Sequence, residues 1–253
     1  MTCRNAGVRL ACVAGTLATT AAIAALNSPA AVSARQTAAG PTVKVRIEGA
    51  QRTLLDQTTV PTHSGYITRM GAPAGMCSAT SAAGALQAAT HGGWSGSWST
   101  SFHDYFVKIV LGDNEGGKHS YWDVLVNHVA ASTGVCGIHL HNGEQLLFAA
   151  VPTTGPGYPL AVRLLSKPIA DRPFRVQVVY YDAKGAAKPL AGVRVVATAV
   201  DGGSRHAVTS PKTGAAGKAT MTERELGPIQ LEATKHGYIR SAPLIAQVMA
   251  PGA

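Results

Sequence analysis

Two cysteines are the residues of this chain that are most ready to do chemistry. Cys77 and Cys136 are the only cysteines after residue 34. In an exported chain such a pair forms a disulfide by default, because the surroundings are oxidising. The alternative, a thiolate nucleophile, has no local sequence signature here and would be oxidised outside the cell. We therefore expect a Cys77–Cys136 disulfide, which contributes about 4 kcal/mol to stability on the chain-entropy account.

The start of the chain indicates the compartment. Arg4 and Arg9 precede an uncharged run at 10–26 that is rich in Ala and Thr, and Val32-Ser-Ala34 follows with small residues. This order is typical of a cleaved secretory signal peptide. The apolar run is also too short for a membrane span, which needs ~20 strongly apolar residues. We expect residues 1–34 to be removed and the mature protein to be secreted, without a transmembrane anchor.

Histidines form the second candidate for chemistry. His139 and His141 alternate with Ile138 and Leu140, so on a strand both imidazoles lie on one face. With other histidines nearby they could hold a metal ion. The alternative is a solvent-facing edge with Ile138 and Leu140 pointing inward. No carboxylate or cysteine stands beside them at metal-ligand spacing, so the second interpretation is favoured and no metal or other cofactor is expected.

Aromatic residues are the candidates for ligand binding. Trp94-Ser-Gly-Ser-Trp98 places two indoles on a Gly/Ser segment, where they could stack on a flat ligand or anchor a loop to the core. Tyr121 and Trp122 are adjacent in an expected strand, so one of them faces the core. We take Trp94, Trp98, Tyr121 and Trp122 as candidate ligand-binding residues.

Motifs of catalysis are missing from the sequence. It contains no Gly-x-Ser-x-Gly, no His-Glu-x-x-His, no phosphate-binding loop and no Gly-x-Gly-x-x-Gly. Asp113 and Glu115 are an acidic pair in a turn, where solubility is the simpler role. We expect a protein that is not an enzyme.

The elements that must position these residues fall into two modules. Residues 153–157 and the prolines on either side of them interrupt any helix or central strand, and we interpret them as a linker. Residues 41–152 carry six Lys and Arg against seven Asp and Glu, whereas residues 158–253 carry thirteen against six. The basic charge therefore belongs to the second module, where the cations are spread singly. That spacing argues against a nucleic-acid groove and allows weak attraction to anionic surface polymers, although a solvated surface is the simpler interpretation.

The first module, 41–152, is expected to be α+β, with one main helix on a mixed sheet. Strands are predicted from alternating or apolar runs at 42–48, 52–60, 105–111, 121–126 and 145–151, and a helix from the Ala-rich stretch 78–90. The second module, 158–253, is expected to be an all-β sandwich. Short runs rich in Val, Ile, Tyr and Thr recur there between Gly, Pro and Asp turns at roughly ten-residue spacing.

Two family resemblances fit these modules. An ordered series of short motifs in residues ~42–152 resembles the transcobalamin-like C-terminal domain, which implies a β-grasp-like fold and suggests cobalamin as a ligand. The motifs are Arg46-Ile-Glu-Gly49, Trp94-Ser-Gly-Ser-Trp98, Tyr105-Phe-Val107, Tyr121-Trp122, Gly134-Val-Cys-Gly137 and Gly143-Glu-Gln-Leu-Leu-Phe148. The last motif departs from the family, which has Gly-Asp-x-Val there.

Residues ~159–250 resemble the carboxypeptidase regulatory-like or prealbumin-like sandwich, which is Ig-like. The motifs that carry this resemblance are Lys188-Pro-Leu-Ala-Gly-Val-Arg-Val195, Thr213-Gly-Ala-Ala-Gly-Lys-Ala-Thr220 and Ala233-Thr-Lys-His-Gly-Tyr238. Such modules serve as spacers, adhesion units and enzyme accessories.

The expected function is therefore that of an exported, non-catalytic protein that binds a ligand or interacts with the cell surface. Its partner would be a cell-wall or other surface polymer, or an extracellular protein. The alternatives are a corrinoid-type small-molecule binder that acts with a partner, because the large helical domain of cobalamin carriers is missing here, and an accessory subunit of an extracellular enzyme.

Overall fold

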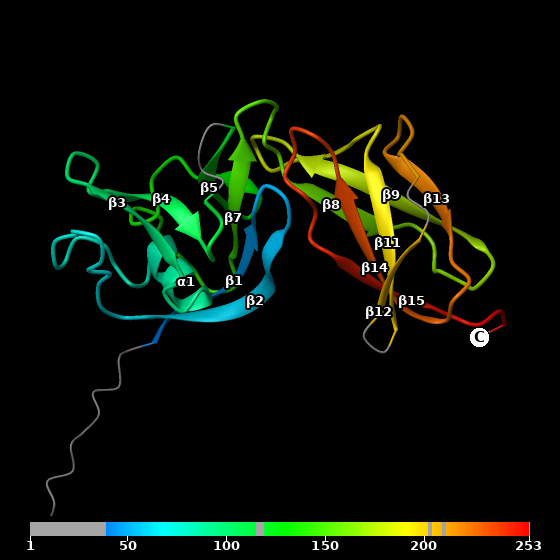
Figure 1. Ribbon diagram of the computed structural model, residues 1–253, viewed down its shortest axis with the longest axis horizontal. Coiled ribbons are helices and arrows are strands. Elements are labelled where there is room, and N and C mark those ends of the chain that lie inside the picture. The colour runs from blue at the N-terminus through cyan, green and yellow to red at the C-terminus, as the bar shows by residue number, and fades with distance from the viewer. Residues whose placement is uncertain (1–38, 115–118, 202–203, 209–210, 253) are drawn as a thin grey trace, which may run out of the picture. The chain divides into compact units, whose positions relative to one another are not determined.

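Strands make up most of the described chain, and one short helix accompanies them (Figure 1). The computed structural model describes residues 39–114, 119–201, 204–208 and 211–252, so the expected signal peptide lies outside the described residues. In chain order the elements are β1 (Ala39–Glu48), β2 (Thr53–His63), α1 (Ala82–Ala89), β3 (Trp94–Ser99), β4 (Asp104–Val110), β5 (Ser120–Val126), β6 (Val129–Ala130), β7 (Gln145–Pro152), β8 (Leu160–Leu164), β9 (Pro173–Tyr181), β10 (Ala187–Pro189), β11 (Arg194–Asp201), β12 (Ser204–Val208), β13 (Lys218–Thr222), β14 (Gly227–Thr234) and β15 (Leu244–Val248).

A five-stranded sheet in the order β2-β1-β7-β5-β6 forms the frame of the first half. β1 pairs in parallel with β7, and the other pairs are antiparallel. β7 is apolar from Leu146 to Val151 without alternation, because both of its faces are buried. Phe148 packs into the main core on one face, and Leu147 packs into a second cluster on the other.

The expected α+β class is wrong, because the structure is predominantly β. α1 has only eight residues and begins after Ser81, although the Ala-rich pattern predicted a helix over 78–90. Ser78 and Ser81 shorten it, since the Ser81 hydroxyl donates a hydrogen bond to the Ser78 carbonyl and holds a turn in place of helix. The helix supplies one large side chain, Leu86, to the core, and strands supply most of the rest. There is thus no main helix around which the first half is organised.

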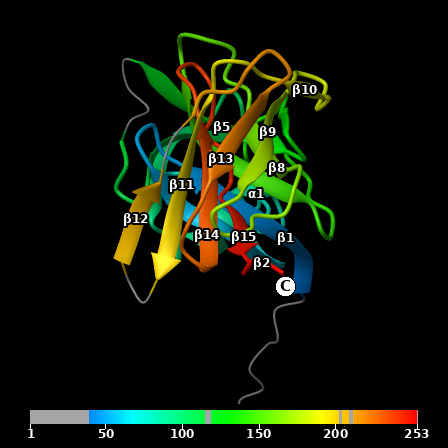
Figure 2. The ribbon, with the colours of Figure 1, turned by 90° about the vertical axis from the view of Figure 1, so that its right-hand side faces the viewer.

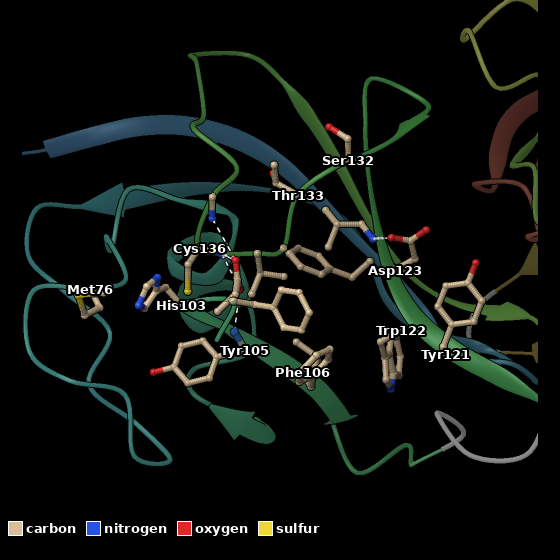
Figure 3. Close-up of a pocket in the computed structure, with 18 of the residues that line it drawn as sticks. Met76, His103, Tyr105, Phe106, Tyr121, Trp122, Asp123, Ser132, Thr133 and Cys136 are labelled. Atoms are coloured by element: carbon tan, nitrogen blue, oxygen red, sulfur yellow. Dashed lines mark hydrogen bonds between the residues drawn. The ribbon is translucent and has the colours of Figure 1, made fainter. Parts of the chain in front are cut away.

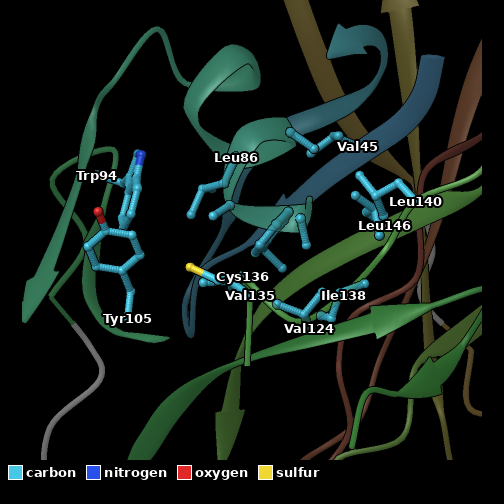
Figure 4. Packing of buried hydrophobic residues seen from close by; sticks show 14 of the residues in the cluster. Val45, Leu86, Trp94, Tyr105, Val124, Val135, Cys136, Ile138, Leu140 and Leu146 are labelled. Carbon is cyan, nitrogen blue, oxygen red and sulfur yellow. The ribbon is translucent and has the colours of Figure 1, made fainter. Parts of the chain in front are cut away.

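The first core gathers residues from α1 and from several strands (Figure 4). Val45, Leu86, Trp94 and Phe148 are all almost fully buried in it. The expected disulfide is present. The Sγ atoms of Cys77 and Cys136 are 2.05 Å apart, and the bond joins the segment before α1 to the loop before β7.

The second half is built from two four-stranded sheets, in a sandwich-like arrangement. One sheet contains β10, β9, β13 and β8, and the other has the order β12-β11-β14-β15 (Figure 2). Alternate residues of their strands are buried, as in β9, where Phe174, Val176 and Val178 point inward. These inward side chains meet those of β11 and β14 in a second core. The main strands lie where alternation and turn residues predicted them, and β10 and β12 are additional.

The two halves also contact each other. Ile239 packs against Leu125, Leu147 and Val151 in a small apolar cluster, and the Arg46 guanidinium donates hydrogen bonds to the Arg240 carbonyl at 3.3 Å. The expected linker 153–157 is held as well, because the Gly157 N–H donates to the Gly237 carbonyl at 3.0 Å. The two large cores span 43–148 and 160–248, on either side of this linker. The division into two modules at 153–157 stays a prediction.

Candidate functional site

The main hollow of the first half runs between β4 and β5 and has a volume of about 1020 Å³ (Figure 3). We call it the β4–β5 groove. It is lined by Met76, by 102–107 before and within β4, by 121–124 of β5, by the loop 132–137, and by His139 and Phe148. Two strands, the loop 132–137 and single residues from two other segments therefore enclose one space.

The groove exists because two strands leave an edge unpaired. β5 pairs with β7 along its whole length, but on its other edge β6 pairs only with Leu125 and Val126. β4 pairs with β3 on one edge, and no described strand pairs with its other edge. The two open edges border the groove, so residues on both faces of β5 can line it.

The floor of the groove is apolar and its rim is aromatic. Val124, Val135 and Phe148 are buried beneath it. Phe102, Phe106 and Tyr121 stand around it with 73%, 54% and 51% of their surface exposed. Leaving large aromatic side chains in water forgoes the gain from burial, so a rim of this kind indicates a contact surface.

One wall of the groove is fixed by Asp104. Its Oδ1 accepts hydrogen bonds from the N–H groups of Tyr105 at 2.7 Å and Cys136 at 3.0 Å, and its Oδ2 accepts one from Gly137 at 3.3 Å. Gly134 lies so close that a Cβ there would stand 2.4 Å from the Asp104 Cγ. Asp104 is therefore a structural acceptor that holds the loop carrying Cys136 against β4.

The second carboxylate of the groove, Asp123, has fewer partners. Its Oδ1 accepts a hydrogen bond from the Val124 N–H at 2.8 Å (Figure 3). Burial raises the pKa of Asp123, and that hydrogen bond lowers it in part. The lining contains these two acids and two histidines, His103 and His139, and no Lys or Arg. Its charge therefore favours an apolar or cationic ligand over an anionic one.

Of the four predicted aromatic residues, two line the groove. Tyr121 is exposed at its rim, whereas Trp122 is half-buried, packs against the first core and has a buried Nε1 without a hydrogen-bond partner in the described structure. Trp94 and Trp98 do not line it.

Trp94 and Trp98 belong to β3 instead of a flexible loop. Trp94 is buried, and its Nε1 donates to Gln87 Oε1 at 2.9 Å. Both indoles pack edge-on against Tyr105, with ring centroids 5.1 Å apart in each case. Their geometry is that of anchors that hold β3 and β4 on the core.

The two candidate metal-binding histidines, His139 and His141, have different neighbours. His139 is exposed and lines the groove, whereas His141 lies 3.5 Å from the carboxylate of Glu144 on the surface. Ile138 and Leu140 are buried between and beside them. Within the described ranges, no three His, Cys, Asp or Glu residues are grouped so that they could bind a metal ion.

Phe102, Phe106 and Met76 are groove residues that sequence reasoning missed. Phe106 was included only in the predicted strand 105–111, and Phe102 and Met76 were not singled out. The exposed position of Phe106 follows from alternation, since its neighbour Tyr105 is buried.

No protein-family model matches the chain, and no curated protein matches its sequence. In the part of the chain that the structure describes, no helix has the length and apolar character needed to cross a membrane.

Proposed function

We propose that this chain is an exported, non-catalytic binding protein that holds an apolar or cationic ligand in the β4–β5 groove. The observation that carries the proposal is the apolar groove of about 1020 Å³ with Phe102, Phe106 and Tyr121 exposed at its rim. Soluble proteins rarely leave large aromatic groups together in water unless a partner covers them. The signal-like residues 1–34 support export.

The roles of the polar groups favour binding over catalysis. Asp104 is occupied by backbone N–H groups, and Cys136 is bonded to Cys77. Both residues shape the wall of the groove, which is what a preorganised binding site requires. Asp123 is left as the acid that could pair with a cation on the ligand.

Two kinds of partner fit the groove. The first is a surface polymer or an extracellular protein that presents an apolar or cationic group. The second is a flat small molecule of corrinoid type, favoured by a volume of about 1020 Å³, which lies at the upper end of the ~300–1,000 Å³ that is usual for small-molecule sites. The resemblance of residues ~42–152 to the transcobalamin-like C-terminal domain supports the second kind.

Two flat dyes of opposite charge test the groove. Thioflavin T is a cation and anilinonaphthalene sulfonate is an anion, and each is titrated while dye and Trp fluorescence are followed. We expect the cation to bind more tightly because the lining has carboxylates and no Lys or Arg. Phe106→Ala and Tyr121→Ala should each weaken binding about threefold to tenfold, since an aromatic contact contributes ~0.5–1.5 kcal/mol.

The matched control is Tyr66→Ala, which removes an aromatic side chain that is 60% exposed and lies outside the groove lining. It should leave dye binding unchanged. Equal losses in Tyr66→Ala and Tyr121→Ala, or tighter binding of the anion, would remove the basis of the proposal. A parallel titration with cyanocobalamin distinguishes the two kinds of partner. Saturable quenching of Trp fluorescence by cyanocobalamin is expected only if the groove binds a corrinoid-type small molecule.

A further inference from the structure

The second half carries two cations directly opposite each other. Arg194 of β11 is bridged to Lys212 in antiparallel fashion. The Val195 N–H donates to the Pro211 carbonyl, and the Thr213 N–H donates to the Val193 carbonyl, so the hydrogen bonds flank the Arg194–Lys212 pair. This is the non-hydrogen-bonded type of pair, in which the two side chains lie closest. On the other side of β11, Arg194 is paired with Thr234 of β14.

This pair is costly as it stands. Like charges directly opposite in a sheet destabilise it. Among the described residues, neither Arg194 nor Lys212 has a carboxylate within ion-pair distance. Both side chains are exposed and point away from the sandwich core. Their repulsion is therefore not relieved within the described protein.

The nearby carboxylates are already paired with other cations. Glu48 lies 2.6 Å from the Arg46 guanidinium and 3.9 Å from that of Arg240. Glu232 lies 3.5 Å from Arg240. These four groups balance one another, so the charge of Arg194 and Lys212 remains in excess.

A third cation is held in place beside the pair. Lys235 Nζ donates to the Ala191 carbonyl at 2.7 Å and stands 5.6 Å from the centre of the Tyr238 ring. All three cations line one cavity of about 720 Å³, together with His119, His236 and the backbone near Gly49. Arg240 and Glu48 line this cavity as well, so four Lys or Arg side chains face one carboxylate and the lining is net positive. The β4–β5 groove, in contrast, is lined by two acids and by no Lys or Arg.

We propose that this cavity is a binding site for a phosphate-type oxyanion, with Arg194, Lys212 and Lys235 as its recognition residues and the Thr234 hydroxyl as a neutral donor. An anion between Arg194 and Lys212 replaces their repulsion with two charge-assisted hydrogen bonds. The guanidinium offers two parallel N–H groups to such an anion, and the ammonium groups act as point charges. The phosphate belongs either to a small free compound or to a repeating surface polymer. The site is separate from the groove and does not depend on the groove's function.

The test uses inorganic pyrophosphate, titrated calorimetrically into the purified full chain at low ionic strength. The charge-reducing variant is Arg194→Gln with Lys212→Gln. Its matched control is Arg175→Gln with Lys218→Gln, which removes two exposed cations from the other sheet of the same half. We expect saturable binding that weakens about tenfold or more in the first variant, because it removes two charge-assisted hydrogen bonds, which are stronger than neutral ones. The control should change the affinity less than about twofold.

Thermal unfolding without pyrophosphate distinguishes a binding role of Arg194 and Lys212 from a stabilising one. Arg194→Gln with Lys212→Gln should raise the melting temperature at low salt, because it removes a repulsion, and the gain should shrink as salt screens charges. Equal weakening in both double variants, a fall in melting temperature in the first, or no pyrophosphate binding by the unmodified protein would each overturn the site. So would binding of citrate as tight as that of pyrophosphate.

The source of the phosphate is distinguished by a second probe. Long-chain polyphosphate is compared with pyrophosphate at equal phosphate concentration. Tighter binding of the polymer, lost in Arg194→Gln with Lys212→Gln, identifies a repeating polymer. Equal binding identifies a small compound. Groove variants such as Tyr121→Ala should leave the affinities for pyrophosphate and polyphosphate unchanged. If the protein fails to bind phosphate, the groove proposal still stands. If it fails to bind the dyes, the oxyanion proposal still stands.

Discussion

Removal of the Asp104 carboxylate should loosen one wall of the β4–β5 groove and destabilise the protein. Asp104→Ala leaves the N–H groups of Tyr105, Cys136 and Gly137 without their acceptor. Cys136 is only 8% exposed, so water cannot fully replace the lost partner there. A hydrogen bond to a charged group contributes about 1.5–3 kcal/mol and an ordinary one about 1 kcal/mol. We expect a loss of about 2–4 kcal/mol in the free energy of unfolding.

The assay is urea unfolding with the disulfide intact, with the midpoint and the slope both recorded. Asp104→Asn keeps one carbonyl acceptor and should cost about half as much. Asp171→Asn is the control, because it removes one member of an exposed ion pair with Arg224 at 3.9 Å, and such pairs contribute at most about 1 kcal/mol. A loss below about 0.5 kcal/mol in Asp104→Ala would refute the role given to this carboxylate.

Three further predictions follow from the sequence and the packing. Cys77→Ala with Cys136→Ala should lower the free energy of unfolding by about 4 kcal/mol in a denaturant titration, because the 59-residue separation is no longer closed. Burial and the nearby Arg46 lower the pKa of His128 from 6.5. The unfolded chain therefore binds that proton more readily, and stability should fall as the pH drops through about 6.5. Burial raises the pKa of Glu48 to about 7, so protonation of Glu48 stabilises the folded protein as the pH falls, which opposes the effect of His128. The contribution of His128 is therefore measured as the difference in melting temperature between the unmodified protein and His128→Asn. Intact mass of protein recovered from the medium should fit a start near Arg35, and recovery of only full-length chain from cells would contradict export.

Local patterns predicted much of this fold. Alternation located β1, β9 and most other strands, because a half-buried strand repeats every two residues whatever its partner. The Cys77–Cys136 bond followed from cysteine count and compartment. The α1 helix was overestimated, because Ser78 and Ser81 hydrogen-bond locally and hold a turn where alanine content alone favours helix.

Only some of the residues that line the groove could be predicted from the sequence. Tyr121 and Trp122 were named, but Trp94 and Trp98 were interpreted as candidates on a flexible Gly/Ser loop. Their segment becomes β3 by pairing with β4, a tertiary contact that its composition does not encode. The groove itself depends on which strand edges stay open. That is decided by the parallel pairing of β1 with β7, between segments about a hundred residues apart.

The parallel pairing of β1 with β7 also has a consequence for the order in which the chain folds. β1 can form its hairpin with β2 early, but its other neighbour begins at Gln145, and β5 needs the same strand. A growing or newly released chain therefore holds two open strand edges until residues 145–152 arrive. Such long-range pairing is slow, and exposed edges attract other chains. The last strand of the first half is thus both its central support and the step at which misfolding competes with folding.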